Sequence, residues 1–215
     1  SKTRQFEKMF ADFVGVKYAC TVTSGTAALY VGLKALGINS GNEVLVPDLT
    51  FVACPNSVEA VGAKPVLVDI EGDSLNIDSK KIKQKITKRT KAIMPVDFNG
   101  RPIDINKIIE IANRYNLSII EDASHGLGCF YGKKHVGTAS DIAIFSFSTP
   151  KIISTGQGGM IVTNNKKLYE KCKAIKDFGR KPDTKRNMRR AFEHPTIGYN
   201  FKFTEFQAAV GIAQM

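Results

Sequence analysis

Apolar residues recur along the chain with two alternating patterns. Apolar side chains three or four positions apart are typical of amphipathic helices, and short uninterrupted apolar runs are typical of buried strands. The first pattern predicts helices over 3–14, 27–36, 51–61, 79–87, 103–115 and 166–178, with a last helix from 204 onward. The second pattern predicts strands over 19–23, 43–47, 65–70, 92–96, 117–120, 142–147 and 160–163. Helix and strand therefore alternate along nearly the whole chain.

This alternation indicates the fold class. Short apolar strands separated by helices are typical of an α/β protein, here a three-layer sandwich whose mostly parallel mixed sheet is covered by helices on both faces. A chain of 215 residues is long enough for one large domain, and we expect 1–215 to form it. The segment 179–199 is rich in Arg, Lys and Pro and predicts a long loop.

Composition and cysteine usage indicate a globular protein of a reducing compartment. Hydrophobic residues make up 43% of the chain and charged residues 24%, which is typical of globular proteins. No apolar run approaches the ~20 residues needed to span a bilayer, and the start at Ser1–Arg4 has no apolar signal region. The cysteines Cys20, Cys54, Cys129 and Cys172 lack the spacing of a metal site, and the first two lie in apolar surroundings. We expect a cytoplasmic protein with no membrane association and no metal.

The net charge of +11 is concentrated in one segment. Between Lys171 and Arg190 there are nine basic residues and two acidic ones. Such a segment suits an anionic small ligand, a nucleic acid or a solvated loop. The sequence shows no helix-turn-helix, zinc finger or basic sheet interleaved with aromatic residues. A DNA-binding regulatory protein is therefore a remote alternative, and we expect no nucleic-acid partner.

Polar residues follow several of the predicted strands, where ligands bind in open α/β sheets. The first strand leads into Ser24-Gly25-Thr26-Ala27 at a helix start, where free N–H groups attract phosphate. The same sequence also serves as an ordinary helix cap. The strand 117–120 leads into Asp122 and His125. Taken alone, an acid such as Asp122 is more often a helix cap or part of an ion pair, and a histidine such as His125 is more often structural.

Lys151 is the candidate nucleophile. It follows the strand 142–147 and precedes the apolar pair Ile152 and Ile153 and a glycine-rich tail. A single lysine is most often a surface residue. A partly buried amine, however, has a lowered pKa and can bond covalently to an aldehyde. The apolar neighbours favour this second role.

Together these residues meet the requirements of pyridoxal phosphate (PLP). PLP needs a lysine for its aldehyde, an acid for its pyridine nitrogen, a phosphate site and a stacking partner for its ring. Lys151 and Asp122 supply the lysine and the acid. The helix start at 25–27 and Ser146 supply phosphate donors, and Phe51, just after the second strand, can stack on the ring.

These residues lie in stretches that resemble the DegT/DnrJ/EryC1/StrS family of PLP-dependent nucleotide-sugar aminotransferases. Each stretch alone is modest evidence, but they follow the family order over nearly the whole chain. The matching stretches are TSGTAAL (23–29), PDLTF (47–51), EDASH (121–125), FSF (145–147) with Lys151 and the glycine pair 158–159, and GYNFK (198–202).

The resemblance implies the large domain of a fold-type I enzyme, similar to that of aspartate aminotransferase. Lys151 matches the lysine that holds PLP, Asp122 the partner of its pyridine nitrogen, and His125 the residue facing the 3-hydroxyl side of the ring. Phe51 matches the stacking aromatic residue.

The remaining cofactor contacts also come from the resemblance. Gly25, Thr26 and Ser146 match contacts to the phosphate. Asn200 matches a residue that reaches the cofactor phosphate of the neighbouring subunit, which implies a homodimer with shared active sites.

The resemblance further implies the substrates. The amino donor is an amino acid, glutamate in similar enzymes, and the acceptor is a nucleotide-linked 4-keto-6-deoxy sugar used for cell-surface polysaccharides or secondary metabolites. The segment 192–200 resembles the perosamine-synthase branch, whose acceptor is linked to GDP. The basic stretch 180–190 would either bind the diphosphate of this nucleotide-linked sugar or remain exposed to solvent.

Two departures from the family pattern bear on these expectations. Gln157 stands where the family commonly has glutamate before the double glycine. The family also continues into a smaller C-terminal domain beyond the point that corresponds to Met215, so we expect this domain to be missing from the sequence. Some relatives replace the lysine with histidine and act as dehydratases. Lys151 argues against that branch. A different PLP reaction on the same scaffold stays an alternative, which product analysis with and without glutamate would decide.

Overall fold

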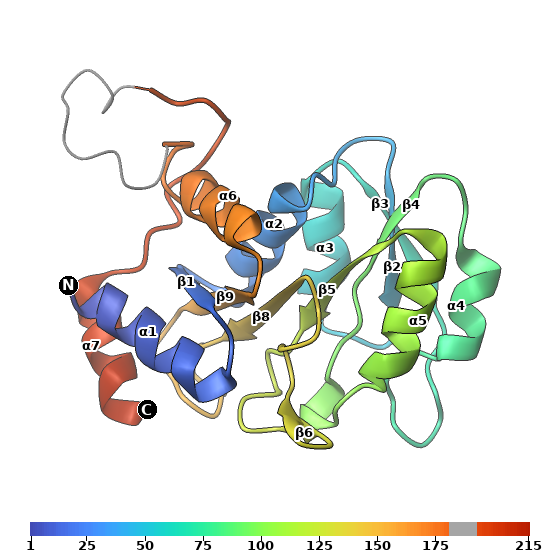
Figure 1. Cartoon of the computed structure of the whole chain (residues 1–215), viewed down its shortest axis with the longest axis horizontal. Coiled ribbons are helices and arrows are strands. Elements are labelled where there is room, and N and C mark those ends of the chain that lie inside the picture. Colours follow the sequence, from blue (N-terminus) through green and yellow to red (C-terminus); the bar gives the residue numbers. More distant parts are fainter. Residues whose placement is uncertain (181–192) are drawn as a thin grey trace.

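A seven-stranded mixed sheet forms the centre of the protein (Figure 1). The computed structural model describes residues 1–180 and 193–215. The strands lie in the order β1-β9-β8-β5-β4-β2-β3. β9 runs antiparallel to both of its neighbours, β1 and β8, and the remaining neighbouring pairs are parallel. Their bounds are β1 (Tyr18–Val22), β2 (Glu43–Pro47), β3 (Lys64–Val68), β4 (Thr90–Ile93), β5 (Ser118–Asp122), β8 (Ile142–Ser146) and β9 (Gly159–Thr163). The predicted α/β class with a mostly parallel sheet is confirmed.

Helices cover both faces of the sheet (Figure 1). One face carries α2 (Gly25–Ala35), α3 (Ala53–Ala60) and α6 (Lys166–Lys176). The other face carries α4 (Ser79–Lys85) and α5 (Ile105–Tyr115) over its β3–β5 half. Over the β1–β8 half of the same face lie α1 (Lys2–Val14) and α7 (Glu205–Gln214). These layers form the predicted three-layer sandwich.

The alternation of side chains along each strand explains why both faces of the sheet carry a hydrophobic core. In β5, Ile120 points into the cluster beneath α2, α3 and α6, while Ile119 points into the cluster beneath α4 and α5. In β8, Ile144 and Phe145 divide in the same way between the α2 side and the α1 side. Because both faces of the strands are buried, they are apolar at nearly every position, which is the pattern seen in the sequence.

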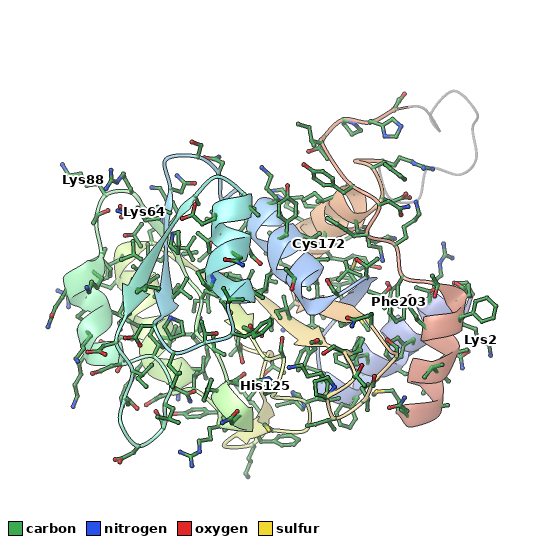
Figure 2. All side chains as sticks on the ribbon, turned by 180° about the vertical axis from the view of Figure 1, so that it is seen from behind. Lys2, Lys64, Lys88, His125, Cys172 and Phe203 are labelled. Atoms are coloured by element: carbon green, nitrogen blue, oxygen red, sulfur yellow. The ribbon has the colours of Figure 1, made fainter. Side chains whose placement is uncertain are left out.

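The topology places several strand ends at one edge of the sheet. Because β9 is antiparallel to both β1 and β8, these two strands are parallel to each other and to β5 and β2. Their carboxyl ends therefore lie at the same edge, together with the first residue of β9. In Figure 2, Lys64 and Lys88 lie on the opposite side of the molecule from His125, which follows β5.

A buried ion pair ties α6 to α1 and β1. Lys176 Nζ donates to Thr21 O at 2.7 Å and to Glu7 Oε1 at 3.2 Å. Glu7 Oε1 also accepts from the Thr21 N–H and hydroxyl. The charged side chains are 13% and 14% exposed, so each needs the other as a partner.

Several element boundaries differ from the predictions. The second helix begins at Gly25 instead of residue 27, because the Ser24 side chain caps it. The sixth helix ends at Lys176, and the chain then turns through Phe178, whose φ is 55°. A small hairpin of β6 (Phe130–Tyr131) and β7 (Lys134–His135) and a 3-10 turn (Phe98–Gly100) were not predicted, because two or three residues give no readable period. The predicted loop 179–199 is described at 179–180 and 193–199, and its remaining residues lie outside the described part.

Candidate active site

Asp122 is the last residue of β5 and has two hydrogen-bond donors in the protein. Its Oδ1 accepts from the Ser124 N–H at 3.0 Å, and its Oδ2 accepts from the Cys54 thiol at 3.0 Å. Asp122 is 6% exposed. The carboxylate is thus held at the strand end with its orientation set by α3 on one side and its own turn on the other.

The start of α2 lies against the ends of β8 and β5. An ideal Cβ on Gly25 would lie 3.0 Å from Ser146 Cβ, 3.2 Å from Ser146 Oγ and 3.6 Å from Ser124 Oγ. Ser24 Oγ accepts from the Ala27 N–H at 3.0 Å, so this donor is engaged by the helix cap. The described residues offer no hydrogen-bond acceptor to the Gly25 and Thr26 N–H groups, which stand at the positive end of the helix. This arrangement can hold an anion such as a phosphate.

Two adjacent glycines allow this close approach. Gly159 pairs with Val22 of β1 and with Ser146 of β8. A Cβ on Gly159 would lie 2.4 Å from Ser24 O and 2.9 Å from Gly25 N. A Cβ on Gly158 would lie 2.6 Å from the Phe203 ring. The double glycine therefore lets β9 pass directly beneath the α2 start.

Lys151 lies on a loop that leaves β8 and returns to β9. The Phe147 N–H donates to Gly158 O at 2.9 Å and closes the loop, and the Lys151 N–H donates to Ser148 O at 3.0 Å. The side chain is partly buried, and this burial lowers the pKa of the Lys151 amine, while the nearby Asp122 charge opposes the shift. An amine with a lowered pKa is more often neutral and so more nucleophilic.

His125 lies within electrostatic reach of both Lys151 and Asp122. Burial lowers the pKa of His125, the Lys151 charge lowers it further, and the Asp122 charge opposes both. The imidazole is thus biased toward its neutral form. His125, Lys151 and Asp122 were predicted from separate stretches of the sequence. The structure brings them close enough for their charges to affect one another.

Phe51 follows β2 and is 72% exposed, so its ring is open for a contact. Its carbonyl accepts from the Cys54 N–H at 3.1 Å, and Thr50 Oγ1 lies 3.2 Å from Cys54 Sγ. Since the Cys54 thiol donates to Asp122, the Phe51 segment is anchored beside the carboxylate.

Asn200 lies apart from this cluster within the described residues. It is exposed and forms an isolated antiparallel bridge with Asp177. The Phe201 N–H donates to Lys176 O at 3.0 Å, which fixes this segment to the end of α6.

A comparison with protein families now decides the identification. The model of the DegT/DnrJ/EryC1/StrS aminotransferase family matches residues 1–215. The chain belongs to this family. The resemblance noted in its motifs is thereby confirmed over the full sequence.

Relatives of known name or structure agree with the family. The chain is 46% identical over 211 residues to a GDP-perosamine synthase of Caulobacter vibrioides, covering 98% of this chain and 55% of that protein. It matches the structure of an aminotransferase from Psychrobacter cryohalolentis with a TM-score of 0.94 and 38% identity, over 99% of this chain and 55% of that one. NtdA from Bacillus subtilis, solved with bound cofactor PMP, matches with a TM-score of 0.92 and 36% identity over 100% of this chain and 47% of that one. The family member described here thus spans about half the length of these relatives.

The structure adds residues that the sequence did not single out. Cys54 lies in the apolar surroundings expected from the sequence and is buried, and its thiol also donates to Asp122. Ser124 lies beside Gly25, and its small polar character directly after a strand end was the available signal. No such signal existed for Cys54, because its partner lies 68 residues away.

Within residues 1–180 and 193–215, no group of three or more His, Cys, Asp or Glu side chains could hold a metal ion. In the same ranges, no helix has the length and apolar character to cross a bilayer.

Proposed function

We propose that this chain is the PLP-binding part of an aminotransferase that moves an amino group from an amino acid to a nucleotide-linked keto sugar. The observation that carries the proposal is the arrangement at the carboxyl edge of the sheet. A half-buried amine with a lowered pKa, Lys151, lies within electrostatic reach of the carboxylate of Asp122. The helix start that can receive a phosphate lies against the end of the adjoining strand β8.

The residues present fit the cofactor. PLP, when bound, supplies an electron sink for amino-group chemistry. In the proposed roles, the Gly25 and Thr26 N–H groups and the Ser146 hydroxyl hold the phosphate, and Asp122 holds the proton on the pyridine nitrogen. Lys151 holds the cofactor covalently.

Three further side chains complete the proposed site. Phe51 would cover one face of the cofactor ring, and His125 would stand on the side of the ring that carries the 3-hydroxyl group. The Lys151 amine would be the general base and acid that moves the α-proton of the amino donor. Its lowered pKa suits this task because a neutral amine can accept a proton near neutral pH.

The substrates and assembly follow from the relatives. The relative named GDP-perosamine synthase favours a GDP-linked keto-deoxy sugar as acceptor, and glutamate is the proposed donor. We propose a homodimer in which Asn200 reaches the partner's cofactor phosphate; its exposure leaves it available for this contact. The four cysteines are free thiols, which supports a cytoplasmic location.

The proposal is tested by trapping the cofactor on the protein. The purified protein is incubated with PLP, reduced with borohydride, digested and mapped by mass spectrometry. We expect a pyridoxyl adduct on Lys151 that is absent from Lys151→Arg. An adduct on a different lysine in the parent protein would overturn the site. Product analysis with and without glutamate then separates amino transfer from dehydration.

A further inference from the structure

Two buried carboxyl groups lie on the face of the sheet opposite to Asp122. Glu121 precedes Asp122 in β5, so its side chain points to the other face. Asp97 lies shortly after the end of β4, the strand that neighbours β5 in the sheet. Glu121 is 2% exposed and Asp97 is 0% exposed. Neither has a role in the proposed mechanism.

The hydrogen bonds around these two groups leave one oxygen without a donor. Glu121 Oε1 accepts from the Gly137 N–H at 2.8 Å, and Oε2 accepts from the Ser140 hydroxyl at 2.7 Å. Asp97 Oδ1 accepts from the Ile103 N–H at 3.0 Å. Asp97 Oδ2 is buried and receives no hydrogen bond from the described residues. The parallel bridge between Val96 and Asp122 places the Asp97 and Glu121 side chains on the same face of the sheet, on adjacent segments.

Two neighbouring buried carboxylates repel each other, and they can form a hydrogen bond only if one of them carries a proton. A buried anionic oxygen without a donor would also be strongly destabilising. Both problems disappear if Asp97 Oδ2 carries a proton and donates it to Glu121. The proton is placed on Asp97 because Glu121 receives two donors, from Gly137 and Ser140, which stabilise its ionised form.

We propose that Asp97 is a carboxylic acid that donates its proton to Glu121, and that this pair positions Asp122 from behind. The second part rests on the proposed function, because it concerns the residue assigned to the pyridine nitrogen. The backbone supplies the connection. The Asp97 N–H donates to Asp122 O at 3.0 Å, and the Asp122 N–H donates to Pro95 O at 2.9 Å.

The electrostatic surroundings agree with this assignment. Burial, together with the charges of Glu121 and Asp122, raises the pKa of Asp97 to about 9, and the hydrogen bond from the Ile103 N–H opposes this shift. Burial also raises the pKa of Glu121, but its hydrogen bonds from Ser140, Gly137 and Asp97 favour its ionised form.

The variant Asp97→Asn tests the proton without needing the cofactor. Its amide keeps a donor toward Glu121 but cannot titrate. In the folded parent protein Asp97 keeps its proton, whereas in the unfolded chain it loses this proton above the ordinary pKa of Asp. The free energy of unfolding of the parent therefore falls as the pH rises, until Asp97 ionises in the folded state as well. We therefore expect the urea midpoint of Asp97→Asn to rise relative to the parent from pH 5 toward pH 9. A constant difference over this range would overturn the proposal, and Asp73→Asn, at an exposed turn carboxyl, serves as the control.

Cofactor affinity tests the positioning role. Above pH 9 the parent's pair carries two like charges, so we expect its Kd for PLP to rise about tenfold relative to that of Asp97→Asn between pH 8 and pH 10. A constant ratio of the two Kd values would show that the pair does not position Asp122. If the parent binds no PLP at any pH, the proposed function and the positioning role both fail, while the stability result still decides whether Asp97 holds a proton.

Discussion

Replacing Gly159 by alanine places a methyl group against the backbone at the start of α2. The new Cβ would lie 2.4 Å from Ser24 O, 2.6 Å from Ser24 C and 2.9 Å from Gly25 N. Ordinary van der Waals contact begins at 3.4 Å, so β9 or the helix start must yield by about 1 Å. These atoms are backbone, so no side-chain rotation can relieve the clash.

The cost divides between stability and binding. Overpacking of this kind costs about 1–3 kcal/mol in the free energy of unfolding. If the helix start moves instead, the Gly25 and Thr26 N–H groups lose their alignment with a bound phosphate. Hydrogen bonds to charged groups are worth about 1.5–3 kcal/mol each, and 1.4 kcal/mol is a tenfold change in affinity. We therefore expect the affinity for PLP to fall about tenfold or more.

Two assays measure the two effects. Urea unfolding gives the change in stability from the midpoint at constant slope. Absorbance titration gives the Kd for PLP. The matched control is Gly72→Ala, because a Cβ there would meet no heavy atom within 4 Å and its φ is not in the left-handed region. If Gly159→Ala equals Gly72→Ala in both assays, the close approach of β9 and α2 is not what requires the glycine.

Three more outcomes follow from the contacts described. Cys54→Ala removes the thiol donor from Asp122 Oδ2, so the Kd for PLP should rise about five- to tenfold in titration, whereas Cys54→Ser, which keeps a donor, should restore most of the affinity. Lys176→Met leaves the Glu7 carboxylate buried without its cation, and urea unfolding should show a loss of about 3–5 kcal/mol; a loss below about 1 kcal/mol would contradict the burial argument. Since burial lowers the pKa of Lys151, the rate of covalent PLP capture, followed by absorbance, should rise with pH and level off at a lower pH than for an exposed lysine.

The sequence was most informative where chemistry is local. Asp78, Asn165 and Thr204 each begin a helix by accepting a backbone N–H, as residues of their type do. The order of phosphate loop, aromatic residue, acid and lysine was readable because each follows a strand that is apolar at nearly every position. Helix ends were less readable: α6 stops at Lys176 because the chain must pair with the Asn200 segment, which the local pattern does not encode.

The sequence by itself determined the α/β class, the candidate residues and their order along the chain. Only the tertiary structure decided which of them meet. The reversed direction of β9 brings Gly159 beneath Ser24, and the strand order brings Ser146 and Ser124 to Gly25. The Cys54–Asp122 contact and the placement of Asp97 beside Glu121 have the same origin. Periodicity reports which face of an element is buried, whereas strand order and register decide which distant residues share that face.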